Sequence, residues 1–398
     1  MLTLLTLVAL QLPQAALHVE IISVSSVLVQ SSDLVYQGSF KLPQGQIGTS
    51  SFSYGGSALA FNEAHNSLFL VGHPYQQQVA EISIPALGET AVIIQPFTDL
   101  SEGRMLSVGQ SPCCDNPQVG GLLVYKGQLY ESVYLYYDGT ASQVLSHFTS
   151  GLDLLVRSDI SGPYQIGAYG LVPGQNTAGF VDGWMVHVPS EWQSALGGPV
   201  LVGQCCIPII SRTSLGPSAF AIDPAQIGST PAPAVPLLYY TGQHVLPDQG
   251  GLSLANVTTQ MGGAVFPEGT RSLLFFGRIG LGKYCYGEGT SDKSLDGTGP
   301  PADPWCYDPA EGSKGPHMYP YEYFVWAYDA VDLTKVKQGL MQPWDVRPYA
   351  TWPLILPNPI SEQIIQGVTY DPSTNRIFVA QYHGDVDRPL IHVFHVKL

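Results

Sequence analysis

Five residues of acid–base type end runs of apolar residues that recur along the chain. They are His73, Tyr137, His244, Arg278 and His383. Histidine and tyrosine side chains can move a proton, and arginine can neutralise an anion such as a sugar carboxylate. These five residues are therefore the expected catalytic set. A buried structural role for any one of them is the alternative.

A second group of polar and aromatic residues lies at other run ends or in the loops beside them. Aromatic rings stack on the apolar faces of sugars, while amide, carboxylate and guanidinium groups bind hydroxyls. The sequence therefore predicts a substrate-binding set of Gln204, Glu102, Arg104, Tyr284, Trp305, His317, Tyr321 and Tyr382.

The elements that must position these residues form a repeat. Small residues, often Gly-Gly, precede a short apolar run, a turn and a second apolar run. The runs are rich in β-branched and aromatic residues, which favour strands, and the turns contain Gly, Pro, Asp and Asn. Four units are clear and two are weaker, with first runs starting near residues 55, 120, 179, 218, 262 and 367.

Further strands follow several of these pairs, and four antiparallel strands per repeat are typical of a propeller blade. The repeat resembles the six-bladed β-propeller class over residues 34–398, with five or seven blades as alternatives. Residues 34–43 are expected to pair with the last blade, and about 283–321 form a long loop insertion. The chain also resembles uncharacterised exported propellers of bacteria and their viruses, but no characterised family, because sialidase, WD40 and kelch signatures are absent.

The resemblance implies an all-β fold in which the first strand of each blade starts, and the second ends, on the same face. The catalytic and substrate-binding sets would then surround one mouth of the central channel. Long loops, where function concentrates, would roof this mouth. Structural lining of a wet channel is the alternative.

The charge of the chain excludes several classes of protein. It holds 16 Lys and Arg against 31 Asp and Glu, a formal net charge of −15, while 45% of its residues are hydrophobic. Nucleic-acid binding needs a basic face, and disorder needs few apolar residues, so neither is expected. With 43 Gly and 32 Pro the chain is also unlike a coiled coil.

Residues 1–16 fit a signal peptide with an apolar core at 2–10, followed by an extension over 17–33. The run is too short for a stable membrane span, and a secreted, periplasmic or cell-surface protein is expected.

Six cysteines fit export, in which disulfides are the default. They are Cys113, Cys114, Cys205, Cys206, Cys285 and Cys306. Cys285–Cys306 is the simplest pair. The adjacent pairs either close on themselves as rigid platforms or bridge to one another.

Recognition of an extracellular glycan, with cleavage by a lyase or glycosidase mechanism, is the favoured function, and a small molecule is the other ligand considered. A non-catalytic adhesin, lectin or surface structural protein is the main alternative, so enzymatic activity stays open. A metal- or quinone-dependent oxidoreductase is the third. Calcium or another divalent metal is the cofactor considered, from His73, His244, His317 and His383 or from acidic loops with Asp385 and Asp387. The oligomeric state is not predicted.

Overall fold

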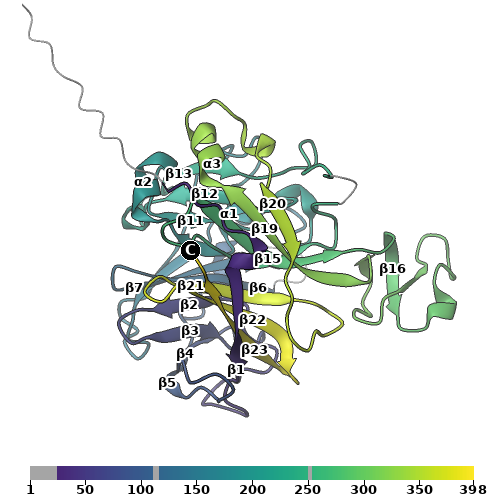
Figure 1. Ribbon diagram of the computed structural model, residues 1–398, viewed down its shortest axis with the longest axis horizontal. Coiled ribbons are helices and arrows are strands. Elements are labelled where there is room, and N and C mark those ends of the chain that lie inside the picture. Colours follow the sequence, from purple (N-terminus) through teal and green to yellow (C-terminus); the bar gives the residue numbers. More distant parts are fainter. Residues whose placement is uncertain (1–24, 111–115, 250–252) are drawn as a thin grey trace, which may run out of the picture.

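The computed structural model describes residues 25–110, 116–249 and 253–398. They form five four-stranded antiparallel sheets arranged as the blades of a β-propeller, together with a three-stranded arm (Figure 1). The first strands of the blades contact one another in a closed ring, in the order β2, β6, β10, β14, β21 and back to β2. The all-β propeller prediction is confirmed.

Blades 1 to 3 are built from strands that follow one another along the chain. Blade 1 holds β2 to β5 (Leu59–Asn62, Ser67–Val71, Val79–Ser83 and Ile93–Thr98). Blade 2 holds β6 to β9 (Pro117–Tyr125, Gln128–Leu135, His147–Gly151 and Ser161–Tyr164). Blade 3 holds β10 to β13 (Met185–His187, Val200–Val202, Ala219–Ile222 and Ala234–Leu238).

Blades 4 and 5 recruit strands that are distant in the sequence. Blade 4 holds β14, β15, β19 and β20 (Gln260–Val265, Ser272–Gly280, Tyr321–Asp329 and Ala350–Pro353). Blade 5 holds β21, β22, β23 and β1 (Ile365–Asp371, Arg376–Asp385, Arg388–Val396 and Leu34–Phe40). The pairing of Leu34 with Val396 and of Phe40 with Ile391 closes the ring as expected.

The count of five blades corrects the favoured count of six and falls within the range considered. The two weaker repeat units, which start near residues 179 and 218, are halves of one sheet. Strand β11 of the first half pairs with β12 of the second, Val200 opposite Ile222 and Val202 opposite Phe220. Each half has the run–turn–run pattern of an independent hairpin, so the pattern alone counts them twice.

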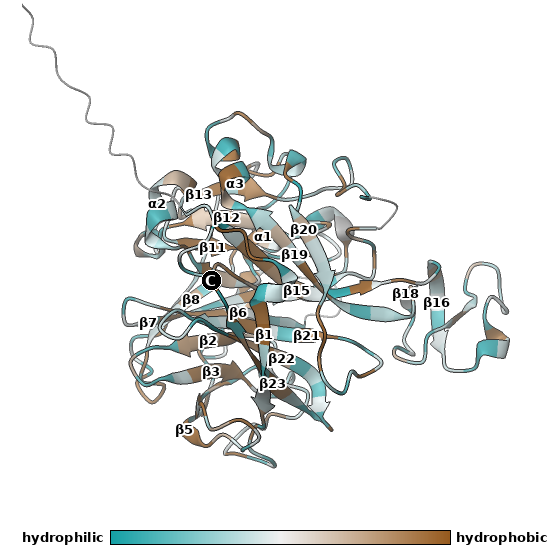
Figure 2. Cartoon of the chain, in the orientation of Figure 1, coloured by the Kyte–Doolittle hydropathy of each residue, from teal (hydrophilic) through white to brown (hydrophobic). Residues whose placement is uncertain are grey.

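Hydrophobic clusters fill the space between each pair of neighbouring blades. For example, Phe40, Leu59 and Phe378 join blade 5 to blade 1, while Phe275 and Trp184 join blade 4 to blade 3. All nine residues of β15 are buried. Strands buried on both faces explain the long apolar runs and the low charge content, and Figure 2 shows hydrophobic residues along β2 and β3.

The helices are short. They are α1 (Ala178–Val181), α2 (Ser190–Leu196) and α3 (Ala330–Lys337). Short 3-10 turns occur at Ser31–Asp33, Met105–Val108, Ile210–Arg212, Pro224–Gln226, Lys293–Leu295 and Pro343–Asp345. Within the described ranges, no helix has the length and hydrophobicity that crossing a membrane requires.

The insertion between β15 and β19 forms the arm, which projects from the side of the propeller (Figure 1). Its strands are β16 (Cys285–Thr290), β17 (Trp305–Tyr307) and β18 (Gly315–His317). Strand β16 pairs in parallel with β17 and antiparallel with β18. The expected disulfide Cys285–Cys306 joins β16 to β17. The arm is therefore an ordered small sheet rather than an irregular loop.

The second disulfide joins the adjacent residues Cys205 and Cys206 in the loop between β11 and β12. This pairing corrects the alternative in which these cysteines bridge to Cys113 and Cys114. The latter two lie outside the described residues, as do residues 1–16. Disulfides are typical of proteins from oxidising compartments, and secretion stays a prediction.

Candidate functional site

The mouth of the propeller is the face at which the second strand of each blade ends. Arg278 lies near the end of β15, Tyr382 and His383 lie near the end of β22, and His73 follows β3. Tyr136 and Tyr137 follow β7. These residues at the ends of second strands therefore lie at the mouth, as the repeat predicts.

Arg278 is the centre of a cluster of charged and aromatic groups. It is only 5% exposed. Its guanidinium carbon lies 4.1 Å from the centroid of the Tyr321 ring, and its Nη1 donates a 2.5 Å hydrogen bond to the carbonyl of Glu362. Burial lowers the pKa of Arg278, whereas Tyr321, Asp308, Glu311 and Glu362 raise it. Three carboxylates thus lie in the electrostatic surroundings of one guanidinium, but none is within ion-pair distance of it in the described part of the chain.

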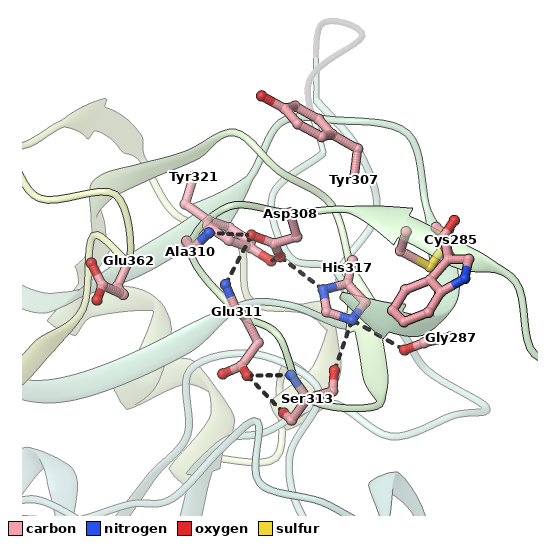
Figure 3. A network of polar contacts seen from close by, with 12 residues as sticks. Cys285, Gly287, Tyr307, Asp308, Ala310, Glu311, Ser313, His317, Tyr321 and Glu362 are labelled. Atoms are coloured by element: carbon pink, nitrogen blue, oxygen red, sulfur yellow. Dashed lines mark hydrogen bonds and ion pairs between the residues drawn. A yellow bond between two sulfur atoms is a disulfide. The ribbon is translucent and has the colours of Figure 1, made fainter. Parts of the chain in front are cut away.

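The arm supplies part of this cluster through Asp308 (Figure 3). The Asp308 carboxylate accepts hydrogen bonds from the Tyr321 hydroxyl at 2.5 Å and from His317 Nδ1 at 2.8 Å. His317 Nε2 lies 3.2 Å from the Gly287 carbonyl and 3.1 Å from the Ser313 carbonyl. Because each ring nitrogen faces only acceptors, both must donate, and the ring is an imidazolium.

The pKa values of this network agree with the geometry. Burial alone would lower the pKa of His317, but the hydrogen bond and charge of Asp308 and the two carbonyls raise it above its usual value. Burial acts to raise the pKa of Asp308, but hydrogen bonds from His317 and Tyr321 lower it. His317 is 1% exposed and Tyr321 is 5% exposed, so neither is placed to reach a ligand; Tyr321 supports Arg278, and His317 holds Asp308.

Glu311 and Glu362 are two mouth carboxylates that the sequence analysis did not select. Glu311 is exposed at the base of the arm, and Glu362 lies in the loop between β20 and β21. Both raise the pKa of the Tyr382 phenol, after the larger effect of its burial. Gly289 helps to place Glu311, because a Cβ at this glycine would collide with the Glu311 carbonyl. Neither glutamate ends a strand, so no repeat position marks it.

Aromatic rings connect the remaining mouth residues. His383 stacks on Tyr382 at 3.6 Å between centroids, and its Nδ1 lies 3.6 Å from Glu362 Oε1. Tyr54 contacts both His383, at 5.1 Å, and His73, at 5.9 Å. Tyr54 and Tyr136 are 44% and 45% exposed. The mouth therefore combines a buried cation, two carboxylates and exposed rings.

Four residues of the predicted sets lie away from this cluster. His244 stacks on Trp344 at 4.3 Å, because its preceding strand β13 is the fourth strand of blade 3, which ends at the rim. Arg104 donates to the carbonyls of Gly162 and Ile160 beside the outer strand β9, and Glu102 pairs with Arg157 at 3.5 Å. Gln204 is buried beside Asp182, in blade 3.

Tyr284 and Trp305 lie on the arm beside the Cys285–Cys306 disulfide, 52% and 38% exposed. They can contact a long ligand, and among the described residues no hydrogen bond or ring contact joins them to Arg278. The four histidines considered for a metal do not converge: His73 and His383 share Tyr54, whereas His244 and His317 lie elsewhere. Among the described residues, no group of three or more His, Cys, Asp or Glu is arranged to hold a metal ion.

Comparison with known proteins finds similarity of fold. No family model matches the chain, and no curated protein matches it. A glycosyl hydrolase from Bacteroides ovatus is 12% identical, with 94% of this chain and 92% of that chain covered and a TM-score of 0.45. The Bacillus subtilis arabinanase Arb43A is 8% identical, with 87% and 95% covered and a TM-score of 0.42. A calcium-binding regucalcin from Agrobacterium tumefaciens is 10% identical, with 91% and 96% covered and a TM-score of 0.37. These values assign the chain to no family.

Proposed function

We propose that the mouth around Arg278 binds an extracellular glycan. The observation that carries this proposal is the hydrogen bond from Arg278 on β15 to the Glu362 carbonyl in the loop before β21, with Glu311 of the arm in the electrostatic surroundings of the same guanidinium. Carboxylates and guanidinium groups hydrogen-bond sugar hydroxyls. The exposed rings of Tyr54 and Tyr136 offer flat apolar surfaces for sugar rings.

Hydrolysis fits the mouth better than β-elimination does. An eliminating enzyme uses a cation to neutralise a uronate. The charge of Arg278 is already offset by three carboxylates in its electrostatic surroundings, although its Nε has no partner among the described residues. Hydrolysis uses two carboxyl groups on either side of the glycosidic bond, one as acid and one as base or nucleophile. Glu311 and Glu362 are the pair available, and His383 beside Glu362 can orient its carboxylate.

A lectin without catalysis is the second candidate, and the exposed tyrosines favour it. Tyr75 is 89% exposed next to His73, and Tyr54, Tyr136 and Tyr137 are each more than 40% exposed. A rim of this kind binds sugars whether or not cleavage follows. Calcium or another divalent cation, which could bind with the sugar, stays a proposal.

The deciding experiment measures glycan binding and release of reducing ends over a panel of polysaccharides. The variants are Glu311→Gln, Glu362→Gln, Arg278→Gln and His383→Ala, with Glu63→Gln as the matched control. Glu63 follows β2 in the turn on the opposite face of the propeller.

For a hydrolase, we expect Glu311→Gln and Glu362→Gln to lower product formation at least 100-fold with binding changed only a few-fold. Arg278→Gln should weaken binding itself. Binding without product in the wild type supports the lectin. If no glycan binds, or if binding survives all four mouth substitutions at the level of Glu63→Gln, the proposal is wrong.

A further inference from the structure

A second hollow opens beside the mouth, between blades 2 and 3. Its volume is about 470 Å³, which is within the usual range for small-molecule sites. The loop between β7 and β8 forms one wall, and the loops of blade 3 form the other. The lining residues that matter here are Asp138, Gln143, Tyr169, Gln175, Asn176 and Arg212.

Arg212 is the cation of this pocket, and it is only 4% exposed. Its Nη2 donates to the carbonyls of Leu135 and Tyr136, so it is fixed to the end of β7 at the mouth. Its Nε and Nη1 have no hydrogen-bond partner among the described residues. A buried donor without an acceptor destabilises the folded state, and a charged donor does so more strongly, so these nitrogens need an acceptor.

The carboxylates near Arg212 do not supply that acceptor. Asp138 accepts hydrogen bonds from the backbone N–H groups of Ser142 and Gln143. Burial raises the pKa of Asp182 to about 8, although Arg212 lowers it, so this carboxyl is mostly protonated at neutral pH. Within the described ranges, no carboxylate lies within ion-pair distance of Arg212. The guanidinium charge is therefore available to an anion.

The other walls offer two contacts of different kinds. Gln175 Oε1 is a buried acceptor that has no partner in the described part of the chain, and a hydroxyl group would satisfy it. The Tyr169 ring is 66% exposed at the edge of the pocket. An anion for Arg212, a hydroxyl for Gln175 and an apolar face for Tyr169 together describe a sugar acid.

We infer that this pocket binds a carboxylate-bearing sugar unit, a uronate, of an acidic glycan, with Arg212 taking the carboxylate through Nε and Nη1. The inference rests on the proposed glycan function. A glycan that lies along Tyr136 would reach both sites, because the carbonyl of Tyr136 accepts a hydrogen bond from Arg212 and its phenol is within electrostatic range of Glu311 and Arg278. Arg212 confers the preference for acidic sugars, whereas the mouth binds acidic and neutral glycans alike.

The test compares oligogalacturonate, oligomannuronate and glucuronate-containing oligomers with their methyl esters, which lack the negative charge. Binding is measured by calorimetry for the wild type, Arg212→Lys, Gln175→Met and Tyr169→Ala, and each variant is checked by thermal unfolding. Arg157→Gln, on the outer edge of blade 2, is the control for loss of one surface arginine.

We expect at least one acid to bind tenfold or more tightly than its ester, and this preference to disappear in Arg212→Lys. Gln175→Met and Tyr169→Ala leave the buried arginine in place. Each should weaken binding of the same acid at least threefold. Equal binding of acid and ester overturns the inference. A preference for the acid that survives in folded Arg212→Lys also overturns it. If Arg212→Lys does not fold, the inference is overturned when the preference survives in both Gln175→Met and Tyr169→Ala. Binding of neutral glycans alone overturns the inference and leaves the proposed function standing. Binding of no glycan overturns both.

Discussion

Arg278 lies over the ring of Tyr321, and the hydroxyl of the same tyrosine donates to Asp308 on the arm. One side chain of β19 therefore supports the mouth cation and anchors the insertion. Stacking of a desolvated cation on an aromatic ring contributes about 2 kcal/mol. The position of Glu311, which lies three residues after Asp308, depends on the same anchor.

Tyr321→Phe should separate these two roles. The ring under Arg278 stays, but the hydrogen bond to the Asp308 carboxylate is lost, which costs about 1.5–3 kcal/mol. We expect glycan affinity to fall through displacement of Glu311, while the propeller body keeps its melting temperature to within a few degrees. Binding isotherms and thermal unfolding measure the two effects.

Tyr321→Leu is the matched comparison, because it removes both the ring and the hydroxyl. It should weaken glycan binding more than Tyr321→Phe does. Equal affinities for the wild type and Tyr321→Phe would show that the arm is not held through Asp308.

The pairing of His317 with Asp308 makes anchoring of the arm depend on pH. The pKa of His317 is raised, so its contribution to stability is complete below about pH 6.5 and is lost as the pH rises through the folded value. The pKa of Asp308 is lowered, so its contribution is present above about pH 4 and is lost as the pH falls. Hydrogen exchange of the arm amides, corrected for intrinsic rates, should therefore show the greatest protection between about pH 4 and pH 6.5.

His317→Gln keeps a donor but cannot carry the charge. Its arm should be less protected than that of the wild type at pH 5–6, and the difference should shrink toward pH 9. Protection of the wild-type arm that does not change between pH 5 and pH 9 contradicts this prediction.

The sequence predicted the architecture because hairpin units carry local signals. Gly-Gly starts, turn formers and β-branched runs identify β2 with β3, β6 with β7, and β21 with β22. It overcounted the blades because the sheet partner of β11 is a matter of tertiary contact: nothing in residues 218–222 distinguishes a third strand from a first strand.

The blade miscount explains why His244 was misplaced. His244 was treated as the end of a second strand, but β13 is a fourth strand and ends away from the axis. Arg278 and His383 lie near the ends of true second strands, at the mouth. Glu311 and Glu362 were missed because loops that reach the mouth from the arm and from β20 have no periodic signal.

Removing the Cys285–Cys306 disulfide should loosen the arm and spare the propeller. The bond closes a segment with a sequence separation of 21, for which the chain-entropy model gives about 3 kcal/mol. In Cys285→Ser with Cys306→Ser, we expect faster proteolysis at Lys293 and Lys314 and unchanged exchange in β2 and β3. Equal loss of protection in the arm and in blade 1 would show that the arm and propeller unfold as one unit.

The buried carboxyl of Asp182 should make the whole propeller less stable as the pH rises. Burial raises its folded pKa to about 8, against about 3.9 in an unfolded chain. Between these values the folded state holds a proton that the unfolded state has released, so the free energy of unfolding falls by about 1.4 kcal/mol per pH unit from this group.

Asp182→Asn keeps the shape of the protonated carboxyl and does not titrate. In urea unfolding at pH 5, 6, 7 and 8, the free energy of unfolding of the variant should therefore rise relative to that of the wild type at each step. A stability difference that stays constant over this range would mean that Asp182 is ionised in the folded protein, paired with the unpartnered nitrogens of Arg212, and the charge that we assign to the pocket would then be absent.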